Sequence, residues 1–160
     1  MTKKVELFSL PYEIYIHVGE LVLLFAQIEW LIANALLYSE ISTTDYKTIK
    51  DLPSTQVNFE TFLKMKFFQK LVKLKGMGYD TAQLEEIGDY RNLVSHGLIY
   101  KNKTFLKISS VAKKELPPQE LSTEKLLVNI ELLKIEGGSL LDFIEGKGYV
   151  YISQNELPTS

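Results

Sequence analysis

The chain has 160 residues, a formal net charge of -2 and 46% hydrophobic residues, the composition of an ordinary globular domain with its own core. It contains no cysteine and only two histidines, which excludes thiol nucleophiles and disulfide frameworks and argues against a catalytic zinc site. Carboxylates could still bind Mg²⁺, but we expect neither a metal nor a cofactor. The negative net charge means that any attraction for nucleic acid must come from local lysines.

Dense apolar periodicity predicts a first helix over about residues 12–38. Its run 21–37 is the most apolar in the chain, but Glu29 near the middle would cost about 2.5–3.5 kcal/mol at the centre of a membrane span. The N-terminal residues do not resemble a secretory signal, because Glu6 and Pro11 interrupt the apolar stretch. We expect a buried core helix, no membrane association and a cytoplasmic protein.

Turn-forming residues after this helix predict a loop over 39–56. A second helix is expected over about 56–75, because Gly76-Met77-Gly78 is a typical helix end. A third helix begins near Asp80 or Thr81 and runs to Gly97.

After the third helix the spacing of apolar residues changes, and two short strands are predicted within about 98–110. Ser122 or Thr123 begins a fourth helix that reaches about residue 144, where Gly137-Gly138 allows a kink, and YVYIS near the end predicts a last strand. These elements predict a mainly α single domain over 1–160, with a core of about 12–146 and a small β-hairpin after the third helix.

The third helix carries an unusual set of polar side chains. At about 100° per residue, one stripe holds Glu85, Asp89, Asn92 and His96, whereas Arg91 falls on the apolar side beside the small residues Gly88 and Ser95. The small neighbours leave room for another chain or a ligand to approach.

A guanidinium facing the core needs a partner. Glu29, on the apolar face of the first helix, is the natural candidate, and a structural Glu–Arg pair that locks two helices remains an open interpretation. On a straight helix Arg91 and His96 diverge by about 140°. Both would reach one substrate only through the length of the arginine, a distorted last turn or a second copy of the helix.

The segment 89–97, DYRNLVSHG, resembles the signature of HEPN domains (higher eukaryotes and prokaryotes nucleotide-binding): an Arg, a polar residue, a spacer and a His near the end of a core helix. Arg91, Asn92 and His96 match it position by position, and the first helix around Glu29 resembles the family's opening helix. The resemblance implies a HEPN-like four-helix up-down bundle that forms a homodimer, in which two motif helices meet at a composite cleft.

The resemblance also implies a metal-independent endoribonuclease, often a toxin or defence effector. His96 would transfer protons, Arg91 would hold the scissile phosphate and Asn92 would orient them, with Glu29, Asp89 and Ser95 in support. The 2′-OH of RNA would attack, leaving a 2′,3′-cyclic phosphate. An antitoxin protein is a further expected partner, although Leu98 replaces the tyrosine that nucleotidyltransferase antitoxins modify, which argues against regulation at that position.

Lysines supply the expected RNA contacts. They lie on the second helix and after the motif, where Tyr100 and Phe105 are interleaved, at Lys66, Lys70, Lys73, Lys101 and Lys103. Phosphate tracking with base stacking is one interpretation, and solubilising lysines on exposed faces are the other. The alternatives to an enzyme are a non-catalytic module that binds nucleotide, RNA or protein, and a purely structural helical protein.

Overall fold

The computed structural model describes residues 10–42, 59–102, 105–109 and 117–147. Within them the chain is mainly helical, as the sequence predicts. The helices are α1 (Tyr12–Ser42), α2 (Phe59–Lys64), α3 (Phe67–Gly76), α4 (Ala82–His96) and α5 (Thr123–Gly146). Most of the expected loop over 39–56 and the expected last strand lie outside the described residues, but 39–42 belong to α1, four residues beyond the predicted helix end.

Helix α1 is long and apolar enough to cross a membrane, judged by length and composition over Tyr12–Glu40. Half of its most apolar window is buried inside the protein. The buried side chains recur at the spacing of one helix face, at Leu21, Phe25, Ile28 and Ile32. A core helix of a globular protein has the same pattern, so this helix carries little weight as a sign of a membrane span.

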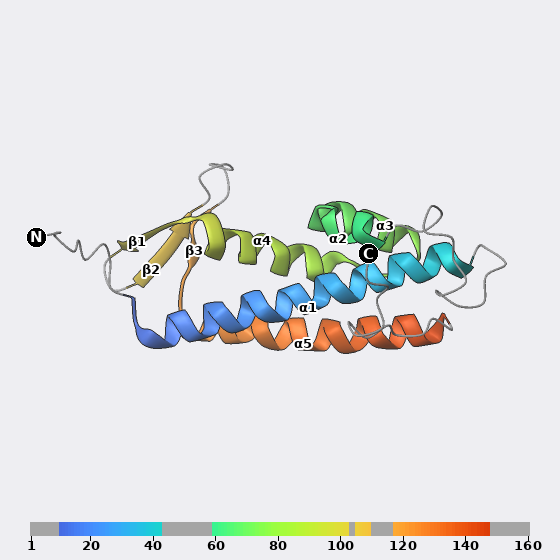
Figure 1. The fold of residues 1–160 in the computed structure, drawn as a ribbon. Coiled ribbons are helices and arrows are strands. Elements are labelled where there is room, and N and C mark those ends of the chain that lie inside the picture. Colours follow the sequence, from blue (N-terminus) through green and yellow to red (C-terminus); the bar gives the residue numbers. More distant parts are fainter. Residues whose placement is uncertain (1–9, 43–58, 103–104, 110–116, 148–160) are drawn as a thin grey trace, which may run out of the picture.

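The three long helices lie side by side (Figure 1). Helices α1 and α5 run in the same direction: Glu20 is 3.7 Å from Lys134 (Oε1 to Nζ), and further along both helices Ile28 lies against Gly137. Helix α4 runs the opposite way. The strict up-down order that we expected would have made the first and last helices antiparallel, so that expectation is wrong for this chain.

The reason lies in the predicted second helix, which is two short helices instead of one long one. Lys66 between them has extended backbone angles (φ -62°, ψ 144°), and its N–H donates to the side-chain carbonyl of Gln69 at 3.3 Å. Both short helices lie over the C-terminal half of α1 (Figure 1). The chain therefore does not return to the N-terminal end of α1 before α4 begins, and α4 is the helix that runs back along α1.

Two strands follow α4 where the sequence predicts them. Strand β1 (Leu98–Asn102) pairs antiparallel with β2 (Phe105–Ser109), with Leu98 opposite Ser109. A two-residue strand that we did not predict, β3 (Gln119–Glu120), pairs with β2. The hydroxyl of Tyr90 on α4 donates to the Glu120 carbonyl at 3.3 Å and joins the helix to this sheet.

Helix α5 begins as predicted, because the Ser122 hydroxyl accepts a hydrogen bond from the Lys125 N–H at 3.1 Å. It continues through Gly137 and Gly138 without a break. One hydrophobic core joins α5 to α1 and α4, and its fully buried members on the last two helices include Leu84, Ile87, Leu126, Ile130, Leu133 and Leu140.

Candidate functional site

Helix α4 carries the Arg-Asn-His motif, and both of its ends are set locally. The Asp80 carboxylate accepts the N–H of Ala82 at 3.1 Å, and the Thr81 hydroxyl donates to Glu85 at 2.7 Å. The helix ends at Gly97, whose N–H still bonds to the Leu93 carbonyl. The motif thus occupies the last turn and a half of a helix that is anchored in the core.

Arg91 points from α4 toward α1. Its Cζ lies 4.2 Å from the centroid of the Phe25 ring, a cation–π arrangement against a side chain that is only 1% exposed. The Arg91 Nε is buried and has no hydrogen-bond partner among the described residues. Leaving a buried guanidinium N–H without an acceptor is costly.

Glu29 does not pair with Arg91, and this corrects the partner that we predicted. The Glu29 carboxylate is 3.3 Å from the Lys70 ammonium of α3 (Oε1 to Nζ). Phe25 and Glu29 are one turn apart on α1. The Phe25 ring stacks against the Arg91 guanidinium, and the Glu29 carboxylate forms an ion pair with Lys70.

Lys70 is also the clearest error among the predicted RNA contacts. Only 2% of the residue is exposed, so it cannot meet a phosphate at the surface. Its neighbours in the prediction, Lys66 and Lys73, are exposed. Lys101 lies in β1, where nothing is described of its side chain, and Lys103 lies outside the described residues.

The other motif residues lie at the solvent-facing side of α4. His96 and Ser95 are exposed, Asn92 is partly buried, and Asp89 is exposed two residues before Arg91. His96 ends the helix, one full turn and more beyond Arg91. Because Arg91 is turned toward Phe25, the described part of the chain shows no contact between Arg91 and His96.

The space beside Gly88 is filled, contrary to the suggestion that it admits another chain or a ligand. A Cβ placed at Gly88 would lie 2.6 Å from Cε1 of Phe67. The Phe67 ring is itself 4.5 Å from Phe25, centroid to centroid. Sequence reasoning missed both rings as neighbours of the motif, since nothing local links α1, α3 and α4.

Two tyrosines, one shortly before α4 and one within it, donate hydrogen bonds to other elements. Tyr79 donates to the Glu136 carboxylate of α5 at 2.7 Å, and burial together with that hydrogen bond raises the pKa of Tyr79. Burial likewise raises the pKa of Tyr90, which donates to the Glu120 carbonyl. Both phenols therefore stay neutral well into the alkaline range.

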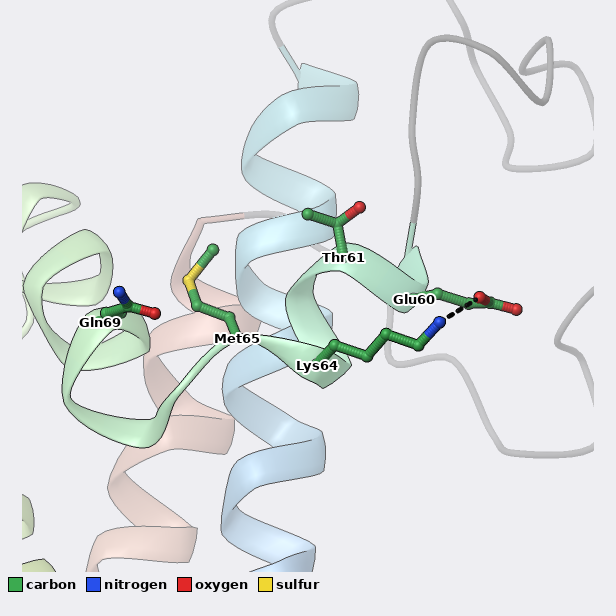
Figure 2. Close-up of a pocket in the computed structure, with 5 residues that line it drawn as sticks. All are labelled: Glu60, Thr61, Lys64, Met65 and Gln69. Carbon is green, nitrogen blue, oxygen red and sulfur yellow. Dashed lines mark hydrogen bonds and ion pairs between the residues drawn. The ribbon is translucent and has the colours of Figure 1, made fainter.

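A shallow depression of about 470 Å³ lies away from the motif, on α2 and the start of α3. Figure 2 shows its lining, Glu60, Thr61, Lys64, Met65 and Gln69, with an exposed ion pair of 3.1 Å between Lys64 and Glu60. It contains none of the predicted site residues. In the part of the chain that the structure describes, no three histidine or carboxylate side chains are grouped as a metal site would require.

Comparison with protein-family models, curated proteins and solved structures finds no match for this chain. Any assignment of function therefore depends on the residues and their geometry.

Proposed function

We propose that the protein is a metal-independent endoribonuclease of the HEPN type, a toxin or defence effector that cleaves RNA in the cytoplasm. The observation that carries the proposal is the state of Arg91. Its guanidinium is held against Phe25, no carboxylate pairs with it among the described residues, and its Nε has no acceptor. The residue as a whole is only partly buried, and a phosphate is a partner that its terminal N–H groups can take.

The proposed chemistry uses the 2′-OH of RNA as the nucleophile. His96 takes the 2′-OH proton, the oxygen attacks the adjacent phosphorus, and the bond to the 5′-oxygen breaks as that oxygen takes a proton from water. Arg91 donates to the phosphate oxygens and stabilises the charge that develops there. Asn92, one residue from Arg91 and a turn from His96, orients either group. The products are a 2′,3′-cyclic phosphate and a 5′-hydroxyl.

The proposal includes a homodimer, because Arg91 and His96 of one protomer face different surroundings. Two copies of α4 meeting near their C-terminal ends would bring His96 of each toward Arg91 of the other. Apolar side chains left exposed on the N-terminal half of α1, such as Tyr12, Tyr15 and Leu23, are compatible with a protein surface that is covered in solution. An antitoxin that restrains the enzyme remains part of the proposal.

One observation favours a different class, a non-catalytic binding module or a structural helix lock. The stacking of Arg91 on Phe25 joins α4 to α1 whether or not a substrate binds. A structural role would make loss of Arg91 destabilising. In an enzyme, loss of Arg91 would abolish cleavage and leave the fold intact.

The deciding experiment is cleavage of a mixed RNA pool in EDTA by the wild type, His96→Ala and Arg91→Lys, with folding checked by circular dichroism. Metal-free cleavage with cyclic-phosphate ends by the wild type, lost in both folded variants, supports the enzyme. Folded wild type that binds RNA without cutting it supports the binding module. Equal cleavage by all three points to a contaminant and removes His96 from the site.

A further inference from the structure

The guanidinium of Arg91 is supported by the Phe25 ring without using its hydrogen-bond donors. The five N–H groups of a guanidinium lie in its plane, so a ring against one face does not occupy them. The Arg91 Nε–H is buried, and the terminal N–H groups are the ones proposed to meet a phosphate. Phe25 is 1% exposed and cannot turn away into solvent. At 4.2 Å from ring centroid to Cζ, the contact constrains the plane of a side chain that otherwise has many rotamers.

Phe25 is constrained in turn by α3. The Phe67 ring lies 4.5 Å from it at an interplanar angle of 54° and is only 7% exposed. Phe67 can approach because α4 carries glycine at position 88, where a Cβ would lie 2.6 Å from its Cε1. Gly88 precedes Arg91 by three residues, on the same side of α4. Helix α4 thus carries Arg91, and its Gly88 leaves the space in which the Phe67 ring packs against Phe25.

We infer that Phe25 is a positioning residue for Arg91, and that Phe67, seated on Gly88, fixes Phe25. The inference rests on the proposed function, since a fixed guanidinium matters most for the phosphate it is to hold. A preoriented donor fork favours the transition state, whereas displacing it by about 1 Å costs on the order of 10²-fold in rate. The effect of removing the ring should therefore fall on kcat more than on KM.

The test compares Phe25→Leu, which keeps an apolar side chain but removes the ring face, with Phe25→Tyr, which restores the face. Phe62→Leu is the matched control, because Phe62 is buried at 5% exposure on α2, whereas the ring that Arg91 stacks on is Phe25. In folded protein, Phe25→Leu should lower kcat by about 10-fold or more with little change in KM. Phe25→Tyr should recover most of the lost kcat, and Phe62→Leu should keep a kcat near that of the wild type. Equal losses in the two leucine variants would overturn the inference.

A second readout does not depend on activity. Arg91 is the only arginine of the chain, so selective ¹⁵N-arginine labelling gives a single Nε–Hε signal. Ring current from Phe25 should shift that signal in the wild type and in Phe62→Leu, and the shift should disappear in Phe25→Leu. If the wild type fails to cleave RNA, the proposed function is overturned, and this signal alone decides the positioning. An unshifted wild-type signal, or one that Phe25→Leu leaves unchanged, would overturn the positioning role of Phe25 as well.

Discussion

Lys70 and Glu29 form an ion pair between α3 and α1, 3.3 Å from Nζ to Oε1, in which the lysine side chain is 3% exposed and the glutamate 30%. Lysine is almost never buried without a partner. The pair explains why Glu29, an acidic residue in the most apolar helix, does not take Arg91. With this carboxylate engaged by the lysine, Arg91 keeps its donors for another group.

Glu29→Gln should destabilise the fold, because it leaves the buried Lys70 ammonium without its anion. Breaking one side of a fully buried pair costs about 3–5 kcal/mol. We expect the lower end of that range for the free energy of unfolding, measured with urea, because Glu29 is partly exposed. The double variant Glu29→Gln/Lys70→Met should recover most of the loss. Lys64→Met, which breaks the exposed pair with Glu60, should change little. A Glu29→Gln protein as stable as the wild type contradicts the importance of the pair.

Gly88→Ala should lower stability although alanine favours a helix. The gain in helix propensity is about 1 kcal/mol, whereas overpacking against the buried Phe67 ring costs about 1–3 kcal/mol. Gly138→Ala is the control, since it lies within α5 and a Cβ there meets nothing within 4 Å. Thermal denaturation should show Gly138→Ala raising the Tm and Gly88→Ala leaving it unchanged or lower. A clear rise in Tm for both variants would mean that the Phe67 ring can move aside at little cost.

Alkaline pH should destabilise the protein through Tyr79 and Tyr90. Their pKa values are raised from the ordinary 10.0 in the folded state, chiefly by burial. Their contribution to stability is therefore complete below pH 10 and is lost as pH rises from 10 toward the folded-state pKa, since the unfolded chain gives up those protons first. Tyr79→Phe should flatten this decline and should also cost about 1–2 kcal/mol near neutral pH, by removing the hydrogen bond to Glu136. Urea titrations at pH 8 to 11 test both parts. If the stability of Tyr79→Phe declined equally steeply with pH, groups other than Tyr79 would be the cause.

The exposed lysines immediately before α3 and within it should account for part of the salt dependence of RNA binding. Each phosphate contact to a single strand contributes about 0.7 to the slope of log K against log salt. Lys66→Glu/Lys73→Glu should therefore reduce the slope by about 1.4, measured by fluorescence anisotropy. Lys147→Glu, an exposed lysine after α5, serves as the control. An unchanged slope would leave these lysines as solubilising residues only.

Two inactive variants should complement each other if the site is composite. Arg91→Ala and His96→Ala each lack one group, but a mixed dimer would retain one cleft with an intact Arg91 from one protomer and an intact His96 from the other. Refolding the two together should restore part of the RNase activity, with each variant refolded alone as the control. No recovery from a confirmed mixed dimer would place both groups in one protomer.

The sequence by itself determined the helices whose signals are local. The period of α1, the Asp80-Thr81 start of α4 and the Ser122 cap of α5 each act within a few residues, so their places could be predicted closely. Even the burial of Lys70 had a local sign, since it lies between Phe67 and Leu74 on the apolar side of α3, but four further lysines nearby concealed it.

Only the tertiary structure decided which side chains meet. The break at Lys66 kept α2 and α3 over one half of α1, so α1 and α5 run in the same direction, whereas the expected order would make them antiparallel. The choice of Lys70 over Arg91 as the partner of Glu29, and of Phe25 as the support of Arg91, depends on how three helices pack. Such contacts join residues 41 and more positions apart, and no periodicity or cap along the chain encodes them.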